Sequence, residues 1–172
     1  MDACQLEVPD SSFDTSICFE SFYYFPEFNR FIDETQRILK PGGVFVGSSV
    51  NKEWHGFNPS PFSVDYYALD DIRSRFETRG FTTEFWVAFE DDPDTLKARI
   101  TASLRSAAVR LNLIPKTMKG KEVLKRLFYG QLTPLPHELI AGQMEPEPLR
   151  PFSEQLKLRN FKYFYFTAIK KS

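Results

Sequence analysis

The sequence predicts an α/β fold with a mostly parallel sheet, and three observations support this prediction. Short runs rich in β-branched and aromatic residues alternate with segments whose apolar residues recur at helical spacing. Glycine and proline stand between these runs, where they end helices or form turns. The chain has 172 residues, of which 42% are hydrophobic and 26% charged, so it holds enough apolar material for one globular domain.

The first expected strand covers residues 15–19 and follows the turn-forming sequence Pro-Asp-Ser-Ser at 9–12. A helix is expected to begin at Pro26, because apolar positions recur every three or four residues as far as Leu39. The sequence Lys-Pro-Gly-Gly at 40–43 should end that helix. Residues 44–48 are apolar enough for a strand buried on both faces.

The alternation continues with a helix marked by Leu69, Ile72 and Phe76, and then a strand at 81–89. Residues 161–169 form a strongly β-prone last strand. We expect a single domain in which residues 1–90 form sheet and helices, 91–160 an insertion, and 161–172 the closing strand. Within the insertion, the sequence predicts helices at 92–111 and 123–128, followed by a proline-rich stretch that cannot be a central strand. The insertion is either a lid over the site or a cover for one edge of the sheet.

Composition excludes several classes of protein. With 22 basic and 23 acidic residues the net charge is −1, which argues against a nucleic-acid partner. No apolar run approaches the roughly 18 residues of a membrane helix, and the N-terminus does not resemble a signal peptide. Cys4 and Cys18 form neither a disulfide framework nor a metal spacing, so we expect a cytoplasmic protein without a metal site.

An ordered set of short motifs indicates a family. The chain carries Asp2 and Ala3, then Leu6, then Pro-Asp-Ser-Ser-Phe-Asp at 9–14, Glu20, and Arg-Ile-Leu-Lys-Pro-Gly-Gly at 37–43. In this order and spacing the set resembles the class I S-adenosylmethionine-dependent methyltransferases, most closely the type 11 group that acts on small molecules. The resemblance covers about the first ninety residues and the last strand, whereas the insertion matches nothing. It implies the C-terminal part of a Rossmann-like sheet whose last strand is antiparallel.

The resemblance also implies which residues contact S-adenosylmethionine. Asp2, Ala3 and Leu6 match positions beside the adenine, although Asp2 could equally be a frayed terminal residue. Phe19 and Glu20 match the segment beneath the methionine part of the cofactor. A carboxylate and an aromatic face are chemically suited to that place, because both attract the positive sulfonium.

Two residues are candidates for acid–base catalysis on a small-molecule methyl acceptor. Tyr24 matches a position where members of the family often carry histidine, although a phenol of ordinary pKa near 10 is a poor base. His55 follows the second expected strand, and imidazole titrates near neutrality. His137 could join them only if the insertion closed over the site. Each of these residues has an alternative interpretation as ordinary packing or surface, and in-line methyl transfer does not always need a base.

One part of the family pattern has no counterpart in this sequence. The family pattern begins with a strand and a Gly-x-Gly-x-Gly turn, and a second strand that ends in a carboxylate follows. None of the 8 glycines of this sequence forms such a turn after a leading strand, and the second strand is missing as well. We therefore expect an N-terminally truncated methyltransferase, with weak or no binding of S-adenosylmethionine by this chain alone. The missing N-terminal part would be explained by a wrongly assigned start of the protein, by a broken gene or by a partner chain that completes the fold. A homodimer could pair the open sheet edges. The alternatives are a non-catalytic methyltransferase-like fragment or subunit and a dehydrogenase fragment.

Overall fold

The computed structural model describes residues 2–91, 100, 103 and 147–172. Residues 1–91 and 147–172 belong to one compact unit, and 92–146 to another. His137 and the helix expected at 123–128 lie outside the described residues. Of the helix expected at 92–111, only residues 100 and 103 are described. In the described part, no helix is long and apolar enough to cross a membrane.

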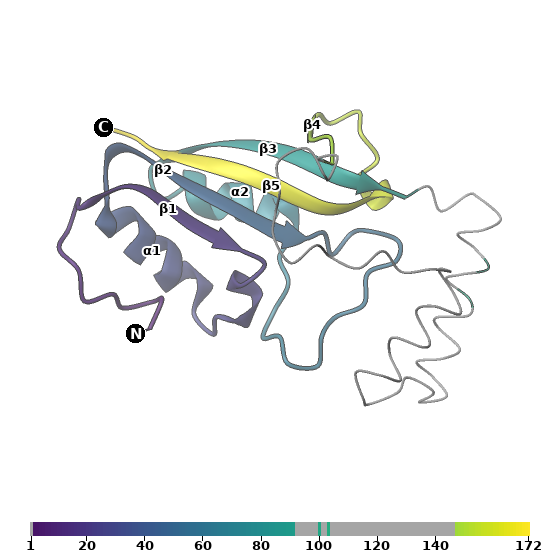
Figure 1. Ribbon diagram of the computed structural model, residues 1–172, viewed down its shortest axis with the longest axis horizontal. Helices are drawn as coiled ribbons and strands as arrows, with labels where there is room; N and C mark the ends of the chain where they lie inside the picture. The colour runs from purple at the N-terminus through teal and green to yellow at the C-terminus, as the bar shows by residue number, and fades with distance from the viewer. Residues whose placement is uncertain (1, 92–99, 101–102, 104–146) are drawn as a thin grey trace, which may run out of the picture. The chain divides into compact units, whose positions relative to one another are not determined.

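The described unit is a five-stranded sheet with two α-helices (Figure 1). The strands lie in the order β1-β2-β5-β3-β4. Their bounds are β1 Phe13–Phe19, β2 Leu39–Val50, β3 Phe81–Glu90, β4 Arg150–Pro151 and β5 Phe161–Lys170. The helices are α1 Phe28–Ile38 and α2 Leu69–Glu77, with short 3-10 turns at η1 Phe22–Tyr24 and η2 Leu158–Asn160.

The last strand runs against its neighbours, as the resemblance implied. β1 pairs with β2 in parallel, whereas β5 lies between β2 and β3 and is antiparallel to both. β1, β2 and β3 therefore run in the same direction, and their carboxyl ends lie at one edge of the sheet. The predicted α/β class, the Rossmann-like fold and the antiparallel last strand are confirmed. The sheet was expected to be mostly parallel, and among the described strands it is a mix in which β1 and β2 pair in parallel and the other pairs are antiparallel.

The junction between α1 and β2 differs from the expected one. The helix already ends at Ile38, and Leu39 begins the strand at once. Residues 40–43, which were expected to stop the helix, instead form a bulge in β2. The register shows this bulge, since Phe13 is opposite Leu39 whereas Thr15 is opposite Val44. Gly42 adopts φ +76°, a conformation that glycine takes without steric cost.

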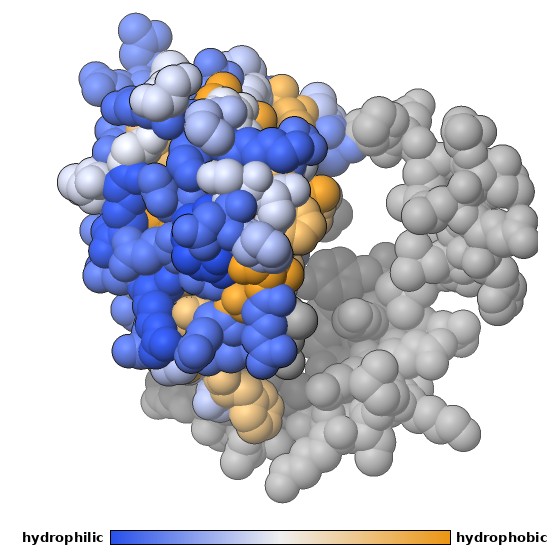
Figure 2. Space-filling model, turned by 90° about the vertical axis from the view of Figure 1, so that its left-hand side faces the viewer, coloured by the Kyte–Doolittle hydropathy of each residue, from blue (hydrophilic) through white to orange (hydrophobic). Residues whose placement is uncertain are grey.

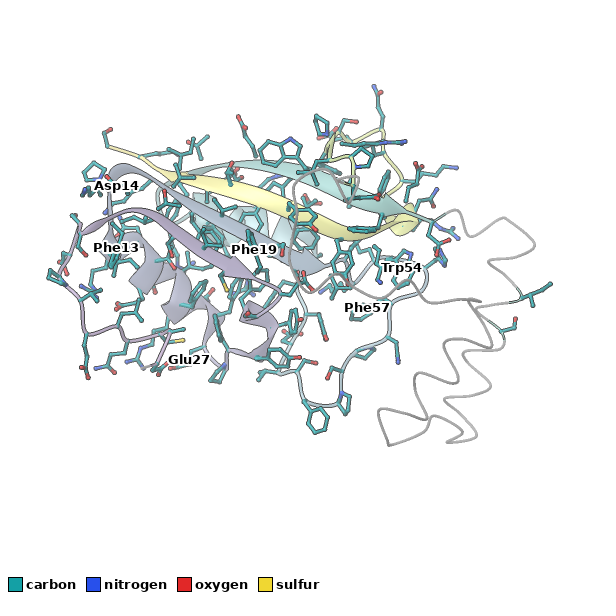
Figure 3. The ribbon with its side chains drawn as sticks, in the orientation of Figure 1. Phe13, Asp14, Phe19, Glu27, Trp54 and Phe57 are labelled. Atoms are coloured by element: carbon teal, nitrogen blue, oxygen red, sulfur yellow. The ribbon has the colours of Figure 1, made fainter. Side chains whose placement is uncertain are left out.

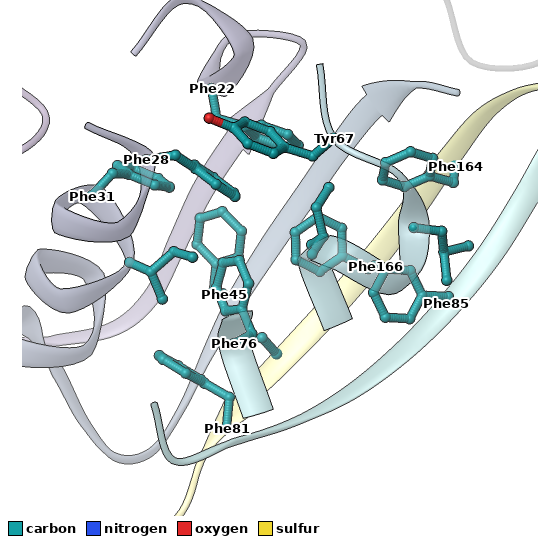
Figure 4. Packing of buried hydrophobic residues seen from close by; sticks show 14 of the residues in the cluster. Phe22, Phe28, Phe31, Phe45, Tyr67, Phe76, Phe81, Phe85, Phe164 and Phe166 are labelled. Atoms are coloured by element: carbon teal, nitrogen blue, oxygen red, sulfur yellow. The ribbon is translucent and has the colours of Figure 1, made fainter. Parts of the chain in front are cut away.

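The core is a layer of aromatic rings between the sheet and the two helices (Figure 4). The Phe45 ring of β2 lies 5.9 Å from Phe31 of α1, 5.2 Å from Phe76 of α2 and 5.6 Å from Phe166 of β5, measured between ring centroids. Both helices meet the same side chain of β2, so they cover the same face of the sheet. The described residues that Figure 2 shows form a mostly hydrophilic surface, with scattered apolar patches.

Candidate functional site

The carboxyl ends of β1 and β2 lie side by side. Phe19 and Ser48 are direct partners in the ladder, and the Glu20 N–H donates to the Ser48 carbonyl at 3.0 Å. The Ser48 hydroxyl lies 3.4 Å from the Glu20 carboxylate. Ligands of open α/β sheets bind outside the carboxyl ends of parallel strands, so this pair marks the candidate site.

Glu20 has an unusual backbone and an unusual carboxyl group. Its φ is +51°, in the left-handed region that few non-glycine residues occupy. Such conformations cost free energy and are concentrated at functional sites. Partial burial raises the pKa of Glu20, an effect that hydrogen bonds involving Ser48, Val50 and Tyr23 only partly offset. The strand end thus holds a half-buried carboxyl group, ready to interact with a cation or a hydrogen-bond donor.

Three tyrosines are packed together beside Glu20. The Tyr23 ring is buried, with its centroid 4.6 Å from that of Tyr24 and 4.8 Å from that of Tyr66. The Tyr23 carbonyl accepts the Val64 N–H at 2.9 Å, which fastens the loop between β2 and α2 over this cluster. Burial and the nearby Glu20 charge raise the pKa of Tyr23, so its hydroxyl stays protonated and can donate a hydrogen bond.

The two catalytic candidates lie in different surroundings. Tyr24 is 46% exposed and packs on Tyr23. The His55 Nε2 lies 3.3 Å from the Asp91 carboxylate, and its main-chain N–H donates to the Arg159 carbonyl at 3.0 Å. The structure therefore fixes His55 where the loop after β2 meets the end of β3 and the start of β5. No contact joins His55 to Tyr24 among the interactions described here.

The loop that carries His55 is anchored by a residue that sequence reasoning missed. Asn51 is buried, and its side-chain NH₂ donates to the carbonyls of Leu158 at 2.8 Å and Phe161 at 3.0 Å. Its side-chain oxygen accepts the Glu53 N–H at 3.0 Å. The signal in the sequence is only a polar residue directly after a strand. Figure 3 shows Trp54 and Phe57 further along the same loop.

The residues expected beside the adenine lie along α1. The Asp2 carboxylate accepts the Cys4 N–H at 2.9 Å, so Asp2 is held in a turn. Ala3 packs against the core. The Leu6 N–H donates to the Glu34 carboxylate at 2.7 Å, and the Arg37 hydrogen bond to Glu34 keeps the pKa of Glu34 below its usual range.

The segment 2–10 thus follows α1 from its beginning toward its end. Cys4 contacts the Glu27 carbonyl at the start of the helix, whereas Asp10 pairs with Arg37 near its end. Since α1 follows β1 through a short connection, Asp2 and Ala3 lie at the end of the unit where β1 finishes. The structure places them at the same end as Phe19 and Glu20, but no direct contact links the two groups among the described interactions.

The donor set suits an organic cation better than a metal ion. Among the described residues, no group of three or more His, Cys, Asp and Glu side chains is placed to hold a metal. Phe19, the residue before Glu20 in the chain, exposes 51% of its surface. An aromatic face and a carboxylate attract a positively charged organic group, so these residues fit the sulfonium of S-adenosylmethionine.

Comparison with known proteins is consistent with this geometry. Residues 1–47 match the family described as a methyltransferase domain. A fatty-acid O-methyltransferase of Mycolicibacterium smegmatis is 42% identical over 45 residues, which are 26% of this chain and 16% of that protein. A probable S-adenosylmethionine-dependent methyltransferase of the same organism is 30% identical over 86 residues, 46% of this chain and 33% of that protein. The chain thus spans a third or less of these relatives.

Solved structures share the fold at low sequence identity. A methyltransferase from Thermotoga maritima, described as a possible histamine N-methyltransferase, superposes with a TM-score of 0.59 at 15% identity, covering 98% of this chain and 61% of that one. The cyclase SpnF gives 0.52 at 18% identity, covering 99% and 54%. The likeness of proteins with such different names shows the fold and leaves the reaction to be argued from the site.

Proposed function

We propose that this chain takes part in methyl transfer from S-adenosylmethionine to a small molecule, because residues 1–47 match the methyltransferase-domain family and two relatives are described as methyltransferases. The observation that carries the proposal is the position of the matched residues. They include all of β1 and most of β2, the two strands whose ends bring Glu20 and Ser48 together. The cofactor of this family, when bound, supplies an activated methyl group on a positive sulfur.

The residues of this chain would bind the cofactor and orient it for methyl transfer. Glu20 and Phe19 attract the positive charge of the cofactor from the end of β1. The Ser48 hydroxyl would help to orient the Glu20 carboxyl group, and the segment of Asp2, Ala3 and Leu6 would hold the adenine. Because methyl transfer is an in-line displacement, positioning alone lowers much of its barrier.

We also propose the kind of methyl acceptor and the residue that deprotonates it. The fatty-acid O-methyltransferase relative and the exposed aromatic residues favour a small acceptor with an apolar or aromatic part. His55, paired with Asp91, is the candidate base, and Tyr24 lines the acceptor side. A cytoplasmic location completes this proposal.

Calorimetric titration of the 172-residue chain with S-adenosylhomocysteine tests the proposal. We expect saturable binding weaker than micromolar, together with methyl transfer from labelled S-adenosylmethionine to one member of a panel of fatty acids and aromatic amines. His55→Gln should then lower kcat and leave cofactor affinity unchanged. Absence of any binding at millimolar ligand would contradict the proposal for the chain acting alone.

A second candidate function is that of a subunit that needs another chain. The observation in its favour is the outer edge of β1, where Phe13, Ile17 and Phe19 expose 42%, 62% and 51% of their surfaces. Exposed, unpaired strand edges normally recruit another strand or are protected. A chain that binds cofactor only after addition of a partner would favour this candidate.

A further inference from the structure

Lys162 places a positive charge at the end of the sheet that carries the candidate site. It follows Phe161 at the start of β5, and its carbonyl accepts the Asn51 N–H at 2.8 Å. Because β5 is antiparallel to β2, the first residues of β5 lie where β2 ends. Burial raises the pKa of Glu20, and the charge of Lys162 is close enough to oppose that rise. A cation and a carboxyl group therefore share one end of the sheet.

The Lys162 ammonium lies over two aromatic rings. Its nitrogen is 5.0 Å from the centroid of the Tyr163 ring and 5.8 Å from that of the Trp54 ring. The side chain is partly buried, and among the described residues no carboxylate, Glu20 included, forms an ion pair with it. Aromatic faces stabilise a cation but accept none of its N–H groups in ordinary hydrogen bonds. The ammonium is therefore suited to receive an anion.

The backbone around Lys162 is firmly held. The Asn51 side chain donates to the carbonyl of Phe161, directly before Lys162, at 3.0 Å. The Asp91 N–H, at the end of β3, donates to the Asn160 carbonyl at 2.7 Å. Since β5 lies between β2 and β3, the position of Lys162 depends on inner strands and not on the outer edges of the sheet.

The surroundings of the ammonium are apolar as well as positive. The Tyr163 ring packs on Phe89, with ring centroids 5.5 Å apart, and Phe89 is 42% exposed. Together with Trp54, these rings offer an apolar surface beside a single positive charge. Small-molecule sites combine these features, with apolar walls and a few polar groups that fix the orientation of the ligand.

We propose that Lys162 binds the carboxylate of the methyl acceptor, so that the acceptor is a carboxylic acid with an apolar part. This inference rests on the proposed methyl transfer. A carboxylate carries one negative charge, which one ammonium neutralises. Glu20 and Lys162 would then sort the two ligands by charge, with the positive sulfonium near the first and the negative acid at the second.

A titration of the 172-residue chain without cofactor, followed by nuclear magnetic resonance, tests the proposal. Hexanoate and hexanamide match in shape and differ in charge, so their difference in affinity measures the effect of the charge. We expect hexanoate to bind at least about tenfold more tightly and to shift the signals of Trp54 and Tyr163. Equal affinities, no binding of hexanoate, or shifts confined to other residues would overturn the proposal.

Substitutions assign the effect to Lys162. Lys162→Met removes the charge and keeps an apolar stem, so it should weaken hexanoate about tenfold and leave hexanamide unchanged. Lys162→Arg keeps the charge and should retain most of the affinity. Lys171→Met is the matched control, since it removes the same charge from an exposed position just after the opposite end of β5. An equal effect of the two methionine variants would disprove a site at Lys162. If they fail to fold, the comparison of ligands on the unsubstituted chain still decides.

Titration with S-adenosylhomocysteine separates this proposal from the proposed methyl transfer. That ligand has a carboxylate of its own, and we expect Lys162→Met to leave its affinity unchanged. A loss as large as that for hexanoate would assign Lys162 to the cofactor and overturn the proposal. Binding of hexanoate through Lys162 without any binding of S-adenosylhomocysteine would support the acid site and contradict methyl transfer. Binding of S-adenosylhomocysteine with no preference for hexanoate would do the reverse.

Discussion

The Ser48 hydroxyl lies 3.4 Å from the Glu20 carboxylate, although 28 residues separate the two in the chain. The contact exists because β1 and β2 are parallel neighbours, with Phe19, the last residue of β1, opposite Ser48 near the end of β2. The left-handed backbone of Glu20 turns the chain away from the sheet and directs it into the tyrosine cluster. Two strand ends thereby form a half-buried polar site on a rigid support.

The raised pKa of Glu20 predicts a pH dependence of stability. The folded state binds the Glu20 proton more tightly than the unfolded chain, so the stabilisation is complete below the ordinary pKa of 4.5 and is lost as pH rises through the folded-state value. Glu20→Gln keeps the side chain neutral. Urea denaturation from pH 4 to 8 should show the variant gaining stability relative to wild type as pH rises. Parallel pH profiles would contradict the raised pKa.

Gly47 should tolerate no side chain. A Cβ atom there would lie 2.5 Å from the Phe166 ring, and that ring belongs to the packed core. Gly47→Ala should therefore lower the free energy of unfolding by about 1–3 kcal/mol. Combining it with Phe166→Leu should recover part of the loss, which a double-mutant cycle by urea denaturation would detect. Strictly additive effects would show that the two residues do not compete for space.

Asn51 should be essential to the loop that carries His55. Asn51→Ala leaves the Leu158 and Phe161 carbonyls without their donor, so we expect a loss of about 2–3 kcal/mol in unfolding free energy. Asn58→Ala, in the exposed part of the same loop, is the control and should change stability by less than about 0.5 kcal/mol. Equal effects of the two substitutions would disprove the anchoring role.

Glu34 should hold the N-terminal segment against α1. Its carboxylate accepts the Leu6 N–H at 2.7 Å, and its pKa is lowered, so this stabilisation is present above pH 4.5 and lost as pH falls through the folded-state pKa. In Glu34→Gln, the Leu6 amide should exchange about tenfold faster near neutral pH, as expected from weakening one charge-assisted hydrogen bond. Glu7→Gln, exposed in the same segment, should leave that rate unchanged.

Much of the fold could be predicted from the sequence because its elements have strong local signals. The strand expected at 81–89 is observed as Phe81–Glu90, and the helix marked by Leu69, Ile72 and Phe76 as Leu69–Glu77. The expected helix ran to Leu39, whereas α1 ends at Ile38, since pairing with β1 draws Leu39 into the sheet. The end of this helix is thus determined by strand pairing rather than by the proline and glycines at 41–43.

The site was only partly predictable. Glu20 could be singled out because it follows a strand, yet its left-handed backbone and its contact with Ser48 depend on the neighbouring strand. Tyr23 has no sequence signal that separates it from Tyr24, although one is buried and the other exposed. The partner of His55, Asp91, lies 36 residues away at the end of β3, a distance that only the folded sheet closes.

If the Glu20 carboxylate helps to bind a positively charged cofactor, its removal should affect a charged and an uncharged form of that cofactor differently. S-adenosylmethionine carries the sulfonium charge and S-adenosylhomocysteine does not. Calorimetric titration should show that Glu20→Gln weakens binding of S-adenosylmethionine about tenfold, the effect of roughly 1.4 kcal/mol, and weakens S-adenosylhomocysteine clearly less. Glu53→Gln, in the exposed loop after β2, should change neither affinity. Equal losses for the two ligands, or no loss in Glu20→Gln, would show that Glu20 does not bind the sulfonium.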